Sequence, residues 1–170
     1  YAIRARVVLL RDLGSALSPT NGFYFIQGLE TLPLRFRVHQ ENAKKVAEYL
    51  ENQQEVERVI YPGFFSGRQK DRAGKYLNCG FGALVGFELK GGQESGKKFI
   101  DSLKLIYHVA NIGDARTLAI HPASTTHSQL SEHDQLKTGV TPGYVRLAVG
   151  IEHIDDIISD IGQALKIASI

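Results

Sequence analysis

The residue with the clearest chemistry in this sequence is Arg146, a guanidinium set inside an apolar strand pattern. Val145, Leu147 and Val149 alternate onto one face of the predicted strand. Arg146 therefore points to the other face. A guanidinium stays protonated, is costly to bury without a partner, and presents a fork of donors that matches a carboxylate. Two interpretations follow: an internal ion pair with an acid on a neighbouring element, or a receptor for a substrate carboxylate at the mouth of a cleft.

A second polar cluster lies in the stretch His121–His127 (HPASTTH). Its two histidines lack the spacing that places two metal ligands on one helical turn, and no cluster of acids or cysteines accompanies them, so we expect no metal. The hydroxyls beside the proline indicate a tight loop that bonds its own backbone. An assembly of Ser124, His127 and Asp134 for nucleophilic catalysis is an alternative, but the nucleophile-elbow pattern is absent.

The elements that must position these residues begin with helices. Apolar residues at helical spacing predict a helix over residues 3–10 that ends at Gly14. Ser18 followed by Pro19 predicts the start of a second helix. A longer helix is predicted to begin at Pro33. Its buried stripe is predicted to comprise Phe36, Ala43, Ala47 and Leu50.

Strand patterns dominate the rest of the chain. Residues 83–89 alternate cleanly, which predicts a strand with one buried face. Ser95 is predicted to cap the helix that follows, and Asp155 and Asp156 lie in the first turn of a final helix, where the helix dipole favours them. Further strand patterns cover residues 56–61, 106–109, 117–120 and 144–149.

This order of elements predicts the fold class α+β. We expect a small, mostly antiparallel sheet, covered on one face by the long helix and the last helix.

Composition sets limits on the class of protein. The chain has 170 residues, of which 43% are hydrophobic and 22% charged, and no apolar run is long enough to span a bilayer. A net charge of +2 without a basic stripe does not indicate nucleic-acid binding. The single cysteine, Cys79, favours a reducing, cytoplasmic setting. The absence of methionine, even at position 1, indicates a fragment of a longer protein.

Several runs closely resemble one enzyme family. They are Ala16–Asn21 (ALSPTN), Gln27–Leu34 (QGLETLPL), Ala110–Gln129 and Gly143–Glu152 (GYVRLAVGIE). Together they are similar to the C-terminal part of the Cys/Met-metabolism enzymes that use pyridoxal 5'-phosphate (PLP). Within the family, Gly86–Gly92 (GFELKGG) is most similar to the homoserine-ester sulfhydrylases. A cystathionine γ-synthase, a cystathionine γ-lyase and a methionine γ-lyase are the alternatives.

The resemblance implies the aspartate aminotransferase-like fold (fold type I) of PLP-dependent transferases. In that fold a small C-terminal α+β domain follows a large domain that holds the cofactor. Residues 1–29 would then be trailing helices of the missing large domain, and residues 30–170 the small domain. The implied partners are the N-terminal cofactor domain, a small amino-acid substrate and further copies of the chain in a homotetramer, without nucleic acid or membrane.

The resemblance also implies an activity and a set of site residues. The reaction would be a γ-replacement that converts O-acetylhomoserine and sulfide to homocysteine and acetate. Arg146 matches the arginine that binds the substrate carboxylate, Asn111 falls where related lyases carry a serine that helps to hold it, and Thr126 aligns with a loop hydroxyl near the substrate. An Asx-turn role for Asn111 and a loop-stabilising role for Thr126 remain open.

The cofactor lysine of this family lies upstream of Tyr1. No lysine here has its setting, so we expect no catalytic residue in this stretch. By itself the stretch should not bind PLP and should be inactive. A non-catalytic assembly remnant is the corresponding alternative.

Overall fold

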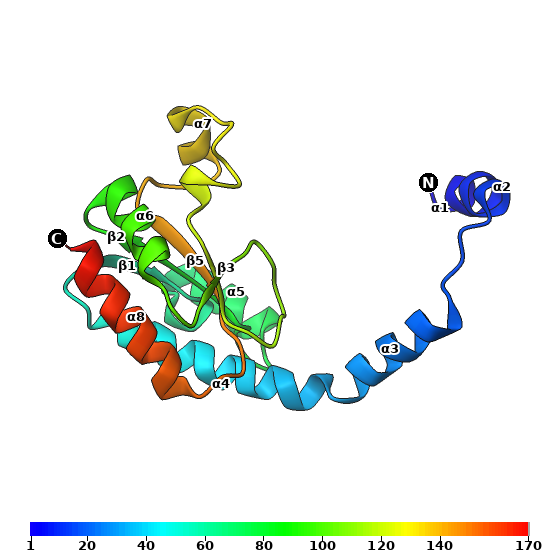
Figure 1. Cartoon of the computed structure of the whole chain (residues 1–170), viewed down its shortest axis with the longest axis horizontal. Helices are drawn as coiled ribbons and strands as arrows, with labels where there is room; N and C mark the ends of the chain where they lie inside the picture. Colours follow the sequence, from blue (N-terminus) through cyan, green and yellow to red (C-terminus); the bar gives the residue numbers. More distant parts are fainter. Residues whose placement is uncertain (170) are drawn as a thin grey trace. The chain divides into compact units, whose positions relative to one another are not determined.

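The computed structural model describes residues 1–169 and divides the chain into two compact units (Figure 1). Unit 1 comprises Tyr1–Leu34, and unit 2 begins at Arg35. Helix α4 (Leu32–Glu51) begins in the first and continues through the second. Among the helices of residues 1–169, none is both long and apolar enough to cross a bilayer.

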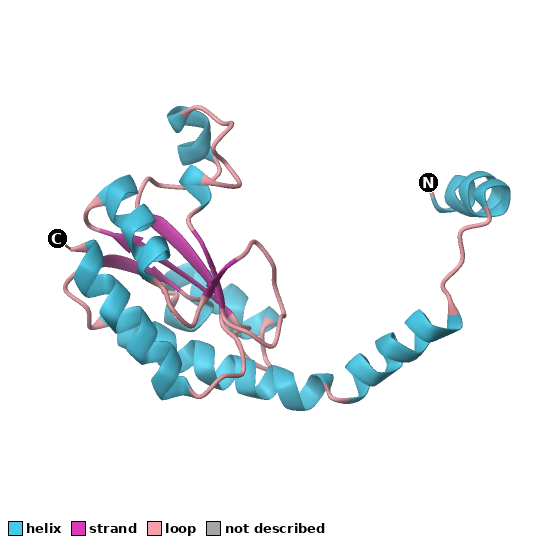
Figure 2. Cartoon of the chain, in the orientation of Figure 1, coloured by secondary structure: helices cyan, strands magenta, loops and turns pink. Residues whose placement is uncertain are grey.

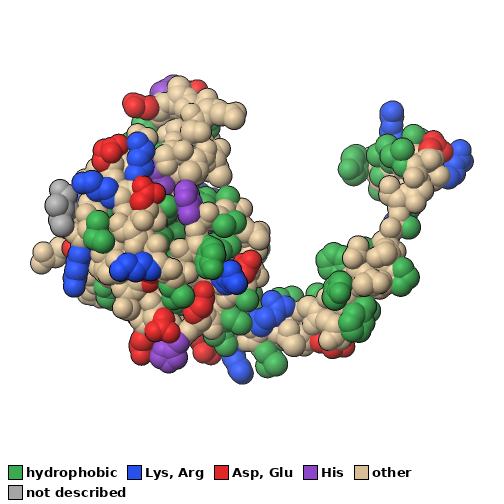
Figure 3. Space-filling view, viewed as in Figure 1, with side chains coloured by type: hydrophobic (Ala, Val, Ile, Leu, Met, Phe, Trp, Pro, Cys, Tyr) green, Lys and Arg blue, Asp and Glu red, His purple; other side chains and the backbone are tan. Residues whose placement is uncertain are grey.

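Unit 1 consists of helices that bury none of their residues. They are α1 (Ala2–Arg4), a π-helical stretch η1 (Ala5–Leu10), α2 (Arg11–Leu13) and α3 (Pro19–Glu30). Both predicted helix boundaries, the end at Gly14 and the start at Ser18, are confirmed. Gly14 ends the first run with a φ of 65°, and the Ser18 hydroxyl accepts a hydrogen bond from the Asn21 amide at 3.2 Å. Apolar side chains lie exposed along this unit (Figure 3), so it has no core of its own.

Unit 2 is built around a five-stranded sheet in the order β1-β2-β5-β4-β3 (Figure 2). The strands are β1 (Val56–Ile60), β2 (Leu84–Leu89), β3 (Tyr107–His108), β4 (Leu118–Ile120) and β5 (Tyr144–Ala148). Besides α4, the helices are α5 (Gly67–Tyr76), α6 (Gly92–Ser102), α7 (Glu132–Lys137) and α8 (Ile154–Ala168), with short 3-10 turns η2 (Pro62–Phe64) and η3 (Pro122–Ser124).

The sheet is mixed, which corrects the expectation of a mostly antiparallel sheet. The pairings β1–β2, β2–β5 and β5–β4 are antiparallel, but the edge strand β3 runs parallel to β4. Helix α6 connects β2 to β3 and returns the chain along the sheet, so that β3 runs in the same direction as β2 and β4. The two-residue length of β3 explains why the sequence did not reveal its direction.

The inner face of the sheet packs against α4, α6 and α8 to form the core. Phe87 of β2 meets Phe99 of α6 edge to face, with ring centroids 5.3 Å apart. Val85, Val145 and Leu147 are fully buried on the same face. Each such side chain contributes about 1.5–3 kcal/mol on leaving water. Helices α4 and α8 lie side by side, as expected for the long and last helices (Figure 1).

Asp160 of α8 fixes the start of the edge strand. Its carboxylate, only 6% exposed, accepts hydrogen bonds from the backbone amides of Lys104, Leu105 and Ile106 at 2.9–3.2 Å. A buried carboxylate requires such donors, because an unpartnered buried charge is expensive. These bonds hold the segment that leads into β3 against the last helix.

Three local expectations are wrong. Phe36 is 45% exposed, because the buried residues of α4 begin only at His39. Ser95 does not cap α6: the helix begins at Gly92, and the Ser95 hydroxyl donates to the Ala168 carbonyl of α8 at 2.9 Å. Strand β2 is buried on both faces rather than one, since Glu88 is covered as well.

Candidate functional site

Arg146 lies on the outer face of the sheet, the face opposite α4, α6 and α8. In the middle of β5 it pairs with Gly86 of β2 on one side and Ile120 of β4 on the other. Its Nη2 donates to the backbone carbonyl of Asn111 at 3.3 Å. Its Nε is buried and has no hydrogen-bond partner within residues 1–169. None of the ion pairs within residues 1–169 involves Arg146, so the described residues supply no internal acid.

One edge of this guanidinium is therefore poorly satisfied. The N–H of Nε and one N–H of Nη2 point along the same edge, which is the edge that grips a carboxylate side-on. A distance of 3.3 Å to a neutral carbonyl is long for a bond to a charged donor. A carboxylate placed along this edge would accept one hydrogen bond from Nε and one from Nη2.

Asn111 meets Arg146 through its backbone rather than its amide. The Asn111 side-chain oxygen accepts from the amide of Ile112 at 2.9 Å, and the residue is exposed. The loop that carries it is anchored at its far end, where the Thr117 amide and hydroxyl donate to Glu152 at 2.7 and 2.8 Å. The structure thus brings Asn111 and Arg146 together, while the predicted donation by the Asn111 amide to a substrate stays a prediction.

Thr126 lies in the loop after η3 and is exposed. Its hydroxyl is within 2.9 Å of Nδ1 of His127, its sequence neighbour. This hydroxyl thus contacts a neighbour in its own loop rather than Arg146 or Asn111. Its predicted contact with a substrate stays a prediction.

The alternative assembly of Ser124, His127 and Asp134 does not form. Ser124 lies 2.8 Å from Nδ1 of His121, and Asp134 accepts from the Ser131 hydroxyl at 2.8 Å. Across residues 1–169 there is also no group of three or more His, Cys, Asp or Glu side chains placed to hold a metal ion.

Glu88 is a second charged residue on the outer face, and it lies opposite Arg58 of β1. One of its oxygens, Oε1, accepts from Nη2 of Arg58 at 2.6 Å and from the Thr141 hydroxyl at 2.9 Å. The hydrogen bond to Glu88, and then their Coulomb attraction, raise the pKa of Arg58. This carboxylate is already paired, and it stands opposite Tyr144 in the sheet rather than opposite Arg146.

Tyr144 lies between the two charges. Its ring covers Gly86, where an added Cβ would lie 2.7 Å from the ring and the hydroxyl. Burial raises the pKa of Tyr144, against a lowering by Arg146, and Glu88 adds to the rise. The glycine opposite Arg146 therefore makes room for an aromatic ring beside the guanidinium. Sequence reasoning missed both residues, because only the cross-strand register brings them together.

The described residues offer no lysine suited to hold PLP as a Schiff base. A lysine with this role is lodged in a desolvated site against the cofactor carbonyl. Every lysine within residues 1–169 is exposed except Lys97, which is half-buried and pairs with Glu94 at 3.0 Å. What this chain does offer is the incomplete edge of Arg146, which suits the carboxylate of an amino acid.

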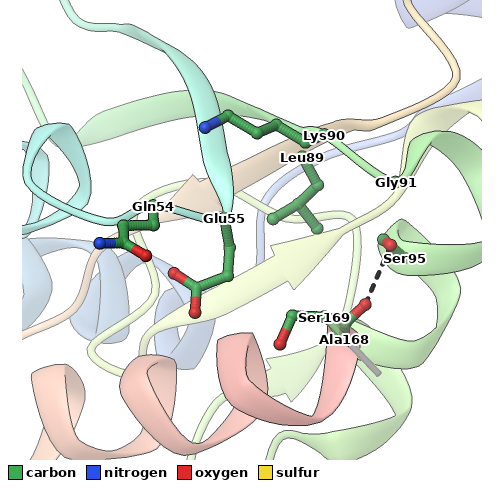
Figure 4. A pocket seen from close by; sticks show the side chains of 8 residues that line it. All are labelled: Gln54, Glu55, Leu89, Lys90, Gly91, Ser95, Ala168 and Ser169. Carbon is green, nitrogen blue, oxygen red and sulfur yellow. Dashed lines mark hydrogen bonds between the residues drawn. The ribbon is translucent and has the colours of Figure 1, made fainter.

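A pocket of about 410 Å³ lies elsewhere in unit 2 (Figure 4). It opens between the turn before β1, the turn after β2 and the end of α8, where Ser95 bonds Ala168. Its lining comprises Gln54, Glu55, Leu89, Lys90, Gly91, Ser95, Ala168 and Ser169. Neither Arg146 nor Asn111 belongs to it, so it is not part of the candidate site.

The fold and the site together define a class: an α+β domain whose sheet holds an arginine, Arg146, that is incompletely partnered within residues 1–169. The family model of the Cys/Met metabolism PLP-dependent enzymes matches residues 2–166. The chain therefore belongs to this family.

Individual relatives agree with this assignment. The chain is 56% identical over 167 residues to the O-acetyl-L-homoserine sulfhydrylase of Leptospira meyeri, a match that covers 98% of this chain and 38% of that protein. It is 48% identical over 168 residues to the homocysteine synthase of Schizosaccharomyces pombe, covering 99% of this chain and 39% of that protein. The chain thus spans about two fifths of the length of the curated relatives that it matches.

A solved structure is similar as well. A crystal structure of an O-acetylhomoserine (thiol)-lyase from Campylobacter jejuni, which contains pyridoxyl-lysine phosphate, superimposes with a TM-score of 0.88 at 42% identity. The match covers 97% of this chain and 39% of that one. The fold of unit 2 is therefore that of a part of a fold type I PLP enzyme.

Proposed function

We propose that this chain is the C-terminal part of a PLP-dependent γ-replacement enzyme, which converts O-acetylhomoserine and sulfide to homocysteine and acetate. Membership of the Cys/Met-metabolism family supports the cofactor, and the names of the relatives from Leptospira meyeri and Schizosaccharomyces pombe support the substrate and product.

The buried, unpartnered Nε of Arg146 is the observation that carries the proposal. In it, Arg146 receives the α-carboxylate of the amino-acid substrate along its Nε–Nη2 edge. PLP, when bound in the complete enzyme, supplies an electron sink for the charge that develops at Cα. Fixing the carboxylate determines which bond of Cα faces that sink, so Arg146 contributes orientation as well as affinity.

Asn111 and Thr126 complete the substrate-binding role proposed for this chain. The Asn111 carbonyl already holds Nη2 of Arg146, and its amide would turn to the substrate carboxylate when the loop closes on it. Thr126 would offer a hydroxyl from the loop after η3. The proposal gives both residues binding roles, not the movement of protons.

The remaining chemistry is assigned to residues outside this chain. No buried lysine lies within residues 1–169, so proton transfer at Cα and Cβ is proposed to depend on an upstream cofactor domain, without which the chain is inactive. Residues 1–29 are proposed to be the trailing helices of that domain and residues 30–170 the small domain. The exposed apolar side chains of unit 1 fit such packing. A homotetramer in the cytoplasm completes the proposal.

The acceptor nucleophile provides the decisive experiment. The complete enzyme is supplied with O-acetylhomoserine and either sulfide, cysteine or methanethiol, and the thioether and thiol products are separated by mass spectrometry. We expect homocysteine to be formed fastest, from sulfide. Cystathionine as the dominant product would instead identify a cystathionine synthase, and release of a keto acid without an acceptor would identify a lyase.

A further inference from the structure

Building on the proposed function, we infer that His121 is a positioning residue, which holds the loop of Thr126 in register with the strand of Arg146. His121 directly follows β4 and is completely buried. Its ring is the point at which the segments that lead to these two residues meet.

Both ring nitrogens of His121 are hydrogen-bonded, each to a different segment. Nε2 lies 2.7 Å from the carbonyl of Pro142, and Nδ1 lies 2.8 Å from the hydroxyl of Ser124. A carbonyl can only accept, so Nε2 carries the proton and Nδ1 accepts from Ser124. The neutral imidazole thus joins the turn before β5 to the turn that leads into the loop of Thr126.

Helix α6 closes over the ring. A Cβ on Gly96 would lie 2.4 Å from Nε2 of His121, so this helix position must lack a side chain for the ring to fit. Burial lowers the pKa of His121, and the nearby charges of Lys97 and His108 lower it further. The hydrogen bond to Pro142 and the charge of Glu94 act in the opposite direction and raise this pKa. The imidazole is held neutral, with the tautomer that the two hydrogen bonds require.

The two segments joined by the ring carry the two site residues. Pro142 precedes β5, in which Arg146 lies, and Ser124 precedes Thr126 in the same turn. The Thr125 hydroxyl also donates to the His121 carbonyl at 2.8 Å, so the loop is tied to both the ring and the backbone of this residue. A shift of the ring would change the separation of Thr126 and Arg146, and errors of about 1 Å in a catalytic arrangement can cost about 100-fold in rate.

The contact between Ser124 and His121 is not that of an activated nucleophile. In such an assembly a third group orients the histidine and stabilises its positive charge, usually a carboxylate. Here the third group is the Pro142 carbonyl, and a protonated ring would be charged in a fully buried place. The arrangement suits a fixed tether.

Two substitutions separate the hydrogen bonds of the ring. The side-chain amide of His121→Gln can reach the place of Nε2 and donate to Pro142, whereas that of His121→Asn reaches only the place of Nδ1. Both are made in the complete enzyme, with His39→Gln as a control. His39 is a buried histidine whose Nδ1 lies 2.6 Å from the Val149 carbonyl, and this substitution removes that contact.

Steady-state kinetics give the first readout. For His121→Asn we expect the KM for O-acetylhomoserine to rise about 10-fold or more, with the KM for sulfide and the cofactor absorbance unchanged. His121→Gln, which keeps the bond to Pro142 but releases Ser124, should raise the KM for O-acetylhomoserine as well, because the tether fails when either bond is lost. His39→Gln should lower the thermal midpoint without changing either KM. Equal KM values in the native enzyme and in His121→Asn, beside a lower midpoint, would overturn the inference.

Amide hydrogen exchange gives a readout that does not depend on the reaction. Exchange over residues 122–130 should be about 10-fold faster in His121→Gln, which releases Ser124 of this loop, than in the native enzyme, and closer to native in His121→Asn, which can keep the bond to Ser124. Unchanged exchange in His121→Gln would also overturn the tether. An inactive native enzyme would instead overturn the proposed function, and the exchange data would still decide the role of His121.

Discussion

On the outer sheet face, two neighbouring strands hold opposite charges in opposite ways. At the β1 side, Glu88 is buried and accepts from both Arg58 and Thr141. At the β4 side, Arg146 has a single long contact with a backbone carbonyl and a buried Nε without a partner. Glu88 lies on β2 and Arg146 on the adjacent strand β5.

The difference separates a charge that is fully paired inside the domain from one whose hydrogen bonding is incomplete. A charge taken out of water is tolerated when donors or acceptors replace the water, as they do for Glu88. Arg146 has only part of that compensation. Its incomplete hydrogen bonding lowers the stability of the domain unless a ligand supplies the missing acceptor. In the proposed function, an anion from outside the domain supplies the partner that Arg146 lacks among the described residues.

The largest effect is expected from Arg146→Met in the complete enzyme. The change removes the proposed partner of the substrate carboxylate while retaining an unbranched side chain. The kcat/KM for O-acetylhomoserine should therefore fall by about 30-fold or more, which is a loss of at least about 2 kcal/mol of transition-state stabilisation. The thermal midpoint should stay level or rise, because an unpartnered donor is lost. Steady-state kinetics and thermal unfolding measure the two effects.

Arg58→Met is the matched control for that substitution. Arg58 lies on the same face, but its partner is internal, so kcat/KM should change less than threefold. If Arg146→Met also changes kcat/KM less than threefold, the distinction between the two ends of the face is lost.

Glu88→Ala is expected to have the reverse profile. It leaves Thr141 and Arg58 without their acceptor and should lower the free energy of unfolding by about 1–3 kcal/mol, with kcat/KM within threefold. Arg58 is largely exposed, so most of the loss comes from the buried groups. Urea unfolding measures it. Glu88→Gln can keep both bonds through its carbonyl oxygen, and a loss as large as that of the alanine variant would contradict this account.

Gly86→Ala tests the space beside Arg146. A Cβ would lie 2.7 Å from the Tyr144 ring, which must then shift towards or away from the guanidinium. We expect a loss of about 1–2 kcal/mol in stability and a higher KM for O-acetylhomoserine. The double variant with Tyr144→Ala should recover part of the stability. Additive losses would show that the ring and the glycine are not coupled.

The smallest effect concerns pH. The folded protein holds the pKa of His121 below its ordinary value near 6.5, so below that pH the unfolded chain binds a proton that the native state does not. This contribution to stability is fully present above about pH 6.5 and is lost as the pH falls towards the folded pKa. Urea midpoints at pH 7.5 and 5.5 should therefore differ less in His121→Gln than in the native enzyme. An equal difference in both proteins would assign the pH dependence to other groups.

Local signals in the sequence predicted local structure. Gly14 and Ser18 act within one helical turn, and both were placed correctly because their bonds join near neighbours. The alternation of residues 145–149 likewise predicted the face on which Arg146 lies. Ser95 was misplaced because a serine hydroxyl suits a helix start and a distant carbonyl equally well, and here the distant Ala168 is its partner.

Contacts between distant segments could not be predicted from the sequence pattern. The Asn111 carbonyl touches Arg146 through a loop conformation that no side chain specifies, and the His121 ring meets Pro142 only because β4 and β5 are neighbours. The resemblance to the PLP enzymes named Arg146, Asn111 and Thr126 together. The structure explains the contact of two of them, while the place of Thr126 relative to a substrate remains a prediction.

The carboxylate of Asp160 has a consequence for the order in which the domain can assemble. The backbone amides of the segment that leads into β3 donate to a side chain 54 to 56 residues further along the chain. During synthesis on a ribosome, the central strands can therefore pair before the Asp160 carboxylate is available to bind the segment that leads into β3. Until α8 has been synthesised and docked, the β3 border of the sheet is an open edge and the most vulnerable place for pairing with another nascent chain.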